Sequence, residues 1–142
     1  MADFLTPAQR SERMSRIRGS DTRPELALRR ELHRAGLRFR LHPGHMPGKP
    51  DIVLARHRAV VLVHGCFWHR HYGCPIATTP KSNTEYWQAK FARNVARDSE
   101  VAQKLLAAGW RVFVVWECEL SSGTKAREAA VRLASELRGS PK

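Results

Sequence analysis

The fold is decided by one short stretch that holds two apolar runs, Asp51-Ile52-Val53-Leu54-Ala55-Arg56-His57-Arg58-Ala59-Val60-Val61-Leu62-Val63. Both runs are rich in β-branched residues and have the length of buried strands. Only residues 56–58 separate them, which is enough chain for a tight turn. The stretch therefore predicts a β-hairpin with strands at residues 51–55 and 59–63.

The second strand leads directly into a chemically unusual segment, His64-Gly65-Cys66-Phe67-Trp68-His69-Arg70-His71-Tyr72-Gly73-Cys74. These eleven residues hold three of the seven histidines and two of the three cysteines. Loops that leave the ends of strands often carry functional residues. We therefore expect the functional site to be built around this segment.

One chemistry in this segment is metal binding. Cys66, His71 and Cys74 lie close together in the sequence, and the remaining cysteine, Cys118, follows a second apolar run at residues 112–115. Three thiolates and one imidazole make a tetrahedral Cys₃His zinc site. The alternatives are unrelated buried thiols, because free cysteine is often a core residue, and disulfides, which the odd cysteine count disfavours. The pattern favours zinc.

His64 and His69 are not needed for the zinc site and point to a second chemistry. A neutral imidazole near a metal-bound water is a natural general base at neutral pH. The alternative is structural: His64 would hydrogen-bond the end of the strand, and His69 would be solvated. Taken alone, each histidine would more often be structural than catalytic.

The composition bounds the class of protein. The 142 residues suffice for one domain with a real core, and 25 Lys and Arg against 13 Asp and Glu give a net charge of +12. Such a charge favours nucleic acid as the partner. No apolar run has the length of a membrane span, and the first residues lack the layout of a signal peptide. We expect a cytoplasmic protein that acts on nucleic acid and does not bind membranes.

The N-terminal part has two expected elements. Residues 1–20 form a basic arm, whose arginines at helical spacing would fold as a short helix or order on a phosphate backbone. A helix then begins at Thr22, with Glu25 in the capping-box relation and Leu26 and Leu28 on its apolar stripe, and ends at Gly36. Glu25 therefore has a structural role available, and a rival role as a carboxylate near a metal-bound water.

The remaining elements follow from periodicity. We expect strands at residues 37–41 and 110–116, a loop at 42–50, a long helix from about residue 84 to Gly109, and a helix at about 125–137 whose apolar residues include Val131. One face of the long helix carries Trp87, Phe91, Val95, Asp98, Val101 and Leu105. Asp98 on an apolar face needs a partner, and an imidazole of the 64–74 segment is the expected one. Residues 21–138 form one domain and 139–142 a tail.

The hairpin carries a further signal. Pro50-Asp51 followed by two strands is the layout of the PD-(D/E)xK nuclease core, in which the aspartate binds Mg²⁺ for attack on a phosphodiester. The acid and lysine usual on the next strand are missing, since it reads Val61-Leu62-Val63-His64. Either the protein is no nuclease, or backbone carbonyls and histidines replace those side chains.

Several motifs together resemble one known family. They are Pro50-Asp51, His64-Gly65-Cys66-Phe67-Trp68-His69 with His71, Thr84-Glu85-Tyr86-Trp87, Asn94-Val95 with Arg97-Asp98, and Trp110-Arg111-Val112 with Trp116-Glu117-Cys118. This combination resembles the Vsr family, the very-short-patch-repair DNA mismatch endonucleases. The match runs in order from about Arg10 to Leu137.

The resemblance implies an α/β fold of the PD-(D/E)xK type, with a mixed sheet flanked by helices and a structural zinc site. It implies Mg²⁺-dependent nicking of one strand 5′ of the thymine in T·G mismatches that arise from deamination of 5-methylcytosine. Asp51 and the backbone carbonyl of Val63 would bind Mg²⁺, and His69 would be the general base. His64 and Glu25 would assist around the metal waters and phosphate, and Asp98 would orient a histidine.

The resemblance also assigns the remaining residues. Phe67, Trp68 and Trp87 would wedge into the duplex beside the mismatch, in keeping with apolar side chains that unstack base steps. The structural zinc would be held by Cys66, His71, Cys74 and Cys118. The interval from His71 to Cys74 is one residue longer than the family pattern, and Gly73 can absorb that residue in a tight turn.

The expected partner is double-stranded DNA with a T·G mismatch, bound by a monomer in the bacterial nucleoid, with contacts to mismatch-repair proteins by analogy. Two other functions stay open. One is a zinc-containing protein that binds DNA distortions without cleaving. The other is a different PD-(D/E)xK-type DNA nuclease.

Overall fold

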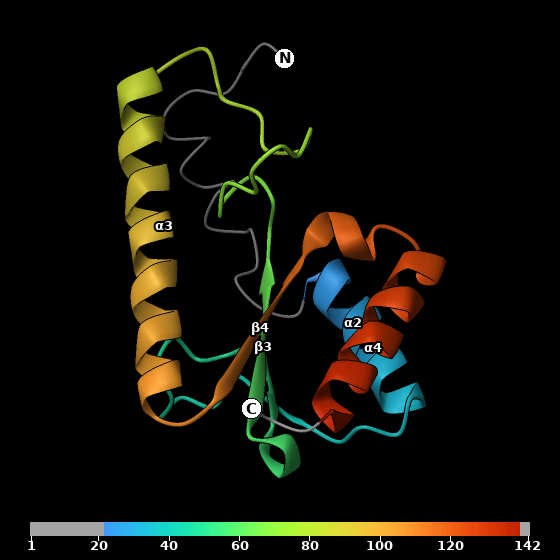
Figure 1. The fold of residues 1–142 in the computed structure, drawn as a ribbon. Helices are drawn as coiled ribbons and strands as arrows, with labels where there is room; N and C mark the ends of the chain where they lie inside the picture. Colours follow the sequence, from blue (N-terminus) through green and yellow to red (C-terminus); the bar gives the residue numbers. More distant parts are fainter. Residues whose placement is uncertain (1–21, 140–142) are drawn as a thin grey trace.

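The computed structural model describes residues 22–139 and shows a four-stranded sheet between helices (Figure 1). The elements in chain order are α2 (Arg23–Arg34), β1 (Arg40–Leu41), β2 (Ile52–Leu54), β3 (Ala59–His64), α3 (Thr84–Ala107), β4 (Arg111–Trp116) and α4 (Gly123–Arg138). Short 3₁₀ turns cover Ala55–His57 and Glu117–Leu120. The expected mixed sheet flanked by helices is confirmed. The basic arm and residues 140–142 lie outside the described residues.

The sheet has the strand order β1-β2-β3-β4. The predicted hairpin is β2 and β3, which pair antiparallel, while β3 and β4 pair parallel. The hairpin turn is the 3₁₀ segment, closed by Arg58 in the left-handed region with φ 50°. In the parallel pair His64 lies opposite Trp116, so both strands end at the same edge of the sheet. The segments that follow β3 and β4 therefore begin side by side.

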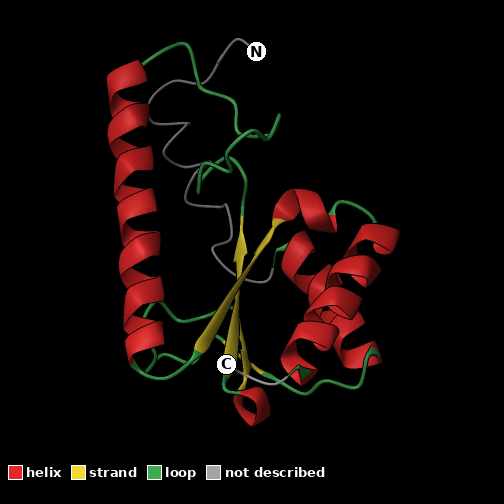
Figure 2. Cartoon of the chain, in the orientation of Figure 1, coloured by secondary structure: helices red, strands yellow, loops and turns green. Residues whose placement is uncertain are grey.

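Helices cover both faces of the sheet, with α3 on one side and α2 and α4 on the other (Figure 2). Side chains alternate along β3. Val61 packs in the larger core with α2 and α4, whereas Val60 and Leu62 pack in a second core with Leu105 of α3. His64 continues the alternation of Val60 and Leu62 and so lies on the side of α3.

The helix ends follow the expected caps. The Thr22 hydroxyl accepts a hydrogen bond from the Glu25 backbone N–H at 3.4 Å. After α2, Gly36 has φ 88° and the Leu37 N–H reaches the Leu32 carbonyl. Gly109 ends α3 in the same way, with φ 89°. Both ends are Schellman motifs, in which a glycine adopts the left-handed conformation that other residues avoid.

The strand expected at residues 37–41 is wrong in extent, because only Arg40–Leu41 pair with β2. Leu37 belongs to the cap of α2 and is buried in the core. Its backbone is committed to the helix end and cannot join the sheet. The sequence does alternate apolar and basic residues, but the first part of the segment completes the C-terminal cap of α2 and does not pair with the sheet.

Three residues expected on apolar helix faces are exposed: Leu26, Val95 and Val131. The inward face of α2 is instead Glu25, Leu28 and Leu32. Alanines form much of the buried face of α4, so α2 and α4 pack closely without Val131. Within the described residues, no helix is long and apolar enough to cross a membrane.

The loop at residues 42–50 packs tightly against α3, and Gly48 marks the contact. Gly48 has φ 70°, and an added Cβ would lie 2.5 Å from Cγ1 of Val101. We predict that Gly48→Ala lowers the free energy of unfolding by roughly 1–3 kcal/mol, through the clash and the left-handed backbone. Gly44→Ala is the control in the same loop, since its Cβ would meet nothing within 4 Å. Equal denaturation midpoints for the two variants would contradict the prediction.

Candidate active site and metal centre

A cleft of about 1000 Å³ opens where β3 ends, between the start of α2 and the face of α3. It is lined by the five residues to which the resemblance assigns catalytic roles, Glu25, Asp51, His64, His69 and Asp98. Val63, Phe67 and Trp68 line it as well, whereas Trp87 does not. The fold thus brings together residues from α2, the hairpin, the 64–74 segment and α3.

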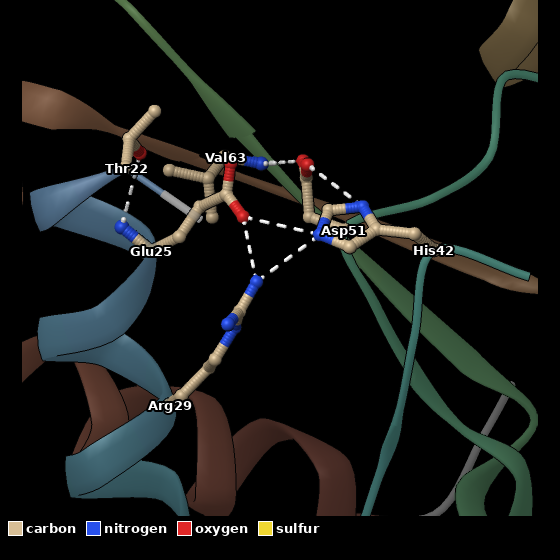
Figure 3. A network of polar contacts seen from close by, with 6 residues as sticks. All are labelled: Thr22, Glu25, Arg29, His42, Asp51 and Val63. Atoms are coloured by element: carbon tan, nitrogen blue, oxygen red, sulfur yellow. Dashed lines mark hydrogen bonds and ion pairs between the residues drawn. The ribbon is translucent and has the colours of Figure 1, made fainter. Parts of the chain in front are cut away.

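Asp51 lies just before β2, with its carboxylate against β3. Its Oδ2 accepts a hydrogen bond of 2.7 Å from the Val63 backbone N–H (Figure 3). Burial raises the pKa of Asp51 to about 6, and the nearby Glu25 carboxylate adds to the increase. The Val63 N–H opposes it by stabilising the charged form. A divalent cation would relieve the cost of this buried negative charge.

Beside Asp51 lies a network that the sequence did not reveal. One nitrogen of the Arg29 guanidinium lies 2.9 Å from Oε2 of Glu25 and 3.1 Å from Nε2 of His42. The other nitrogen of His42, Nδ1, lies 3.8 Å from Oδ1 of Asp51. Glu25 is buried, and its carboxylate meets Arg29 and His42. Glu25, His42 and Asp51 have ligand atoms close enough to hold one metal ion.

The opposite wall of the cleft carries the histidines. The rings of His64 and His69 stack with centroids 4.0 Å apart. His69 Nδ1 lies 2.6 Å from Oδ2 of Asp98, which is the imidazole partner expected for that carboxylate. Burial and the neighbouring His69 lower the pKa of His64 to about 4, so His64 is neutral at neutral pH. An ionised Asp98 accepts the Nδ1 proton of His69, which leaves Nε2 of a neutral ring as a proton acceptor.

The Cys₃His residues converge at the edge where β3 and β4 end. The ligand atoms of Cys66, His71, Cys74 and Cys118 all lie within 4.8 Å of one another. His71 Nδ1 lies 3.6 Å from Sγ of Cys66 and 3.5 Å from Sγ of Cys118. Tetrahedral zinc with ordinary bond lengths holds sulfur and nitrogen about 3.6 Å apart. The donor set therefore fits zinc in both chemistry and spacing.

Details of the backbone and electrostatics support this fit. Gly73 has φ 72° and lies in the turn that brings Cys74 to the other three side chains. A turn of this kind can accommodate the additional residue between His71 and Cys74. Burial raises the pKa of the Cys66 thiol to about 12. The thiolate form at neutral pH thus needs a cation beside it. Trp116 stacks on the His71 ring with centroids 4.2 Å apart and holds its orientation.

Aromatic side chains form one packed cluster at the end of the cleft. Phe67 contacts the rings of Trp68, Trp87 and Phe91 at centroid distances of 5.0, 5.8 and 5.2 Å. Phe91 is buried, while the other three are partly exposed. The resemblance implies DNA contacts for Phe67, Trp68 and Trp87, and in the structure their rings pack against one another, with Trp87 stacked on Phe91.

Arg70 links this cluster to the following loop, a role that was not predicted from the sequence. Its guanidinium donates to the carbonyls of Phe67, Ala77 and Thr78 and to the Thr79 hydroxyl. It also lies over the Phe91 ring, 4.0 Å from the centroid. Its own backbone adopts φ 55°. One side chain therefore ties the 64–74 segment to both α3 and residues 77–79.

Cations surround the carboxylates and aromatic rings of the cleft. Lys49, Lys90 and Arg97 line it, and the Lys90 ammonium lies 5.4 Å from the centroid of a Trp68 ring. Positive charge beside aromatic rings suits a phosphate backbone with bases to stack. The site thus brings together cationic side chains, carboxylates that could hold a hard cation and an imidazole that could accept a proton.

Comparison with known proteins adds independent findings. A family model described as DNA mismatch endonuclease Vsr matches residues 2–74. The chain is 52% identical over 121 residues to a type II nicking enzyme of Xanthomonas oryzae pv. oryzae, covering 85% of this chain and 88% of that protein. It is 41% identical over 138 residues to a type II nicking enzyme of Neisseria meningitidis, covering 97% and 98% of the two chains.

The chain is also 40% identical over 131 residues to the DNA mismatch endonuclease Vsr of Escherichia coli, covering 92% of this chain and 83% of that protein. Similarity of this degree over nearly whole chains leaves no ambiguity about descent. The resemblance of the motifs is therefore confirmed. The chain belongs to the DNA mismatch endonuclease Vsr family and is, by that membership, an endonuclease.

Proposed function

We propose that this protein is a Mg²⁺-dependent endonuclease that nicks one strand of DNA 5′ of the thymine in a T·G mismatch left by deamination of 5-methylcytosine. The observation that best supports this proposal is the arrangement of side chains in the cleft. Asp51 lies on one wall and the His69–Asp98 pair on the other, with Phe67 and Trp68 also lining it. The names of the relatives, a mismatch endonuclease and nicking enzymes, support DNA as the substrate and a single-strand cut.

In this proposal Asp51 and the carbonyl of Val63 bind the catalytic Mg²⁺. The hydrogen bond of 2.7 Å from the Val63 N–H to Asp51 supports it, because it fixes the carboxylate beside the backbone of the residue that carries this carbonyl. A carboxylate and a carbonyl are the oxygen ligands that Mg²⁺ prefers. When bound, the ion would stabilise charge on the phosphate and on the leaving oxygen. Glu25 would hydrogen-bond water near this site from its buried position at the start of α2.

His69 acts as the general base, with its Nε2 accepting a proton from the attacking water. The 2.6 Å contact with Asp98 supports this role, since it fixes the tautomer and stabilises the protonated ring. His64 stays neutral and stacks on His69, so it orients that ring and offers a hydrogen bond to water or phosphate. Asp98 is a positioning residue because it acts through His69.

Phe67 and Trp68 would insert beside the mismatched pair, with Trp87 contacting DNA next to them. A T·G pair is easier to unstack than a matched pair, which gives an aromatic wedge its selectivity. We propose a PD-(D/E)xK-type core, supported by an acid at the start of β2 and the antiparallel β2–β3 pair. The zinc site is structural, and residues 21–138 act as one monomeric domain in the bacterial cytoplasm, with mismatch-repair proteins as further partners.

The first test is strand cleavage by the wild type and Asp51→Asn. Duplexes that carry T·G in a panel of methyltransferase sites are compared with their T·A and C·G forms in Mg²⁺. We expect a nick 5′ of the mismatched thymine, and a loss of at least about 10³-fold in rate for Asp51→Asn, because the variant keeps the shape and loses the charge. Tight mismatch binding without a nick in any context would instead indicate a binding protein. Equal cutting of matched DNA would indicate a different nuclease.

Cation binding should depend on pH through Asp51. Its pKa of about 6 means that a proton competes with the cation below that value, whereas above it the carboxylate is already charged. We expect the dissociation constant for Mg²⁺ to rise roughly tenfold per pH unit below pH 6 and to be nearly constant above pH 7. Calorimetric titration without DNA measures this separately from protonation of the base. A constant affinity from pH 5 to 7 would contradict it.

Removal of a zinc ligand should destabilise the fold. Cys74→Ser is expected to lower the zinc content from one ion per chain and the free energy of unfolding by an amount on the order of a few kcal/mol. The site joins the segments that follow β3 and β4, so the variant should also lose cleavage. Tyr72→Phe is the control, since Tyr72 is 98% exposed in the same loop. Metal analysis measures the zinc content, and thermal unfolding measures the stability. Wild-type protein that contains no zinc would contradict the assignment of these four residues to a zinc site.

A further inference from the structure

The Arg29–His42 contact indicates which tautomer the His42 ring adopts. One guanidinium nitrogen lies 2.9 Å from Glu25 Oε2 and 3.1 Å from His42 Nε2 (Figure 3). A guanidinium can only donate hydrogen bonds, and this nitrogen has two hydrogens to give. His42 Nε2 also lies 3.4 Å from Glu25 Oε2, but the shorter 3.1 Å contact with Arg29 favours Nε2 as an acceptor. In a neutral His42 ring of this tautomer the proton lies on Nδ1.

That proton faces Asp51. His42 Nδ1 lies 3.8 Å from Asp51 Oδ1, and the Val63 N–H holds the other oxygen, Oδ2, at 2.7 Å. A small rotation of the carboxylate or the ring would bring the first distance into hydrogen-bond range. The two oxygens of Asp51 are thus approached from opposite sides, one by the backbone of β3 and one by His42.

The placement of His42 is fixed by its backbone. It directly follows β1, its N–H donates to the Pro50 carbonyl at 3.1 Å, and its φ of 47° is in the left-handed region. A residue other than glycine in this region needs support from its surroundings. Here the loop that begins at His42 returns to Pro50, the residue before Asp51. The imidazole and the carboxylate are therefore held by the two ends of one loop.

We propose that His42, oriented by Arg29, is a positioning residue for the Asp51 carboxylate and sets the affinity of the site for its divalent cation. The series of contacts Glu25–Arg29–His42–Asp51, called the relay below, joins two of the acidic residues that line the cleft, so Glu25 and Asp51 are oriented together. This inference rests on the proposed role of Asp51 as a cation ligand. Partners that orient a metal ligand typically change metal affinity 10- to 100-fold when they are removed.

The test compares two substitutions of His42. In His42→Gln, the amide oxygen can accept from Arg29 while the NH₂ group donates to Asp51, so the relay is kept. In His42→Leu the relay is lost at similar volume. We expect the dissociation constant for Mg²⁺, measured by calorimetry without DNA, to rise about 10- to 100-fold in His42→Leu and less than about threefold in His42→Gln. The Mg²⁺ concentration for half-maximal cleavage should shift by the same factors.

The controls separate this role from stability. His45→Leu removes an exposed imidazole from the same loop and should leave Mg²⁺ binding unchanged. Unfolding temperature and zinc content identify a folding defect. If His42→Leu does not fold, His42→Asn takes its place, because its side chain is too short to reach Arg29 and Asp51 together; it should show the same loss.

Two outcomes would overturn the proposal. Unchanged Mg²⁺ affinity in His42→Leu or in His42→Asn would show that Asp51 is oriented without His42. Equal losses in His42→Gln and His42→Leu, with wild type binding Mn²⁺ or Co²⁺ far more tightly than Mg²⁺, would make His42 a direct nitrogen ligand instead. Asp51→Asn distinguishes these from a failure of the proposed function: if it binds Mg²⁺ as the wild type does, the cation is not held by Asp51 at all.

Discussion

The parallel pairing of β3 with β4 is the constraint on which the site depends. It ends both strands at one edge of the sheet, with His64 opposite Trp116, so that Cys66 and Cys118 lie two residues beyond a shared boundary. The Glu117 carboxylate accepts a hydrogen bond from the Cys66 backbone N–H at 3.0 Å and links the two segments. Were the strands shifted by one residue, side chains would change faces, and His64 would leave the side of α3 where His69 and Asp98 meet.

Burial then gives the two walls of the cleft different chemistries. Burial disfavours the charged form of each group, so it raises the pKa of the Asp51 carboxyl and lowers the pKa of the His64 imidazole. The buried carboxylate of Asp51 is consequently a favourable place for a cation, and His64 remains uncharged beside His69. In the proposed mechanism, a positive His64 would oppose transfer of a proton to His69, whereas the neutral ring does not. The Asp98 carboxylate lies 2.6 Å from Nδ1 of His69.

The sequence predicted the elements whose causes are local. The hairpin followed from two β-branched runs, the ends of α2 and α3 from Thr22 and two glycines, and the Cys₃His group from cysteine spacing. The short β1 was not foreseen, because the alternation of residues 37–41 does not show that Leu37 is used by a helix cap. Arg29, His42 and Arg70 were missed for a related reason: each has one informative partner that the fold brings from another segment, His42 for Arg29, Asp51 for His42 and Phe91 for Arg70. A single arginine or histidine on a basic chain carries no distinguishing signal.

The proposed insertion of the aromatic surface into DNA requires the loop that carries this surface to be ordered before DNA binds. Insertion beside a base step costs a few kcal/mol of unstacking, and a mobile loop would add its own ordering entropy. Residues 65–83 contain no helix or strand, so regular hydrogen bonding does not hold them. The proposed zinc at the Cys₃His group would fix one part of the loop, and Arg70 fixes another by donating to three carbonyls and covering Phe91. Because that ordering entropy is lost on folding, the proposed function leaves the energy of aromatic contact available to discriminate a weakly stacked T·G pair from a matched one.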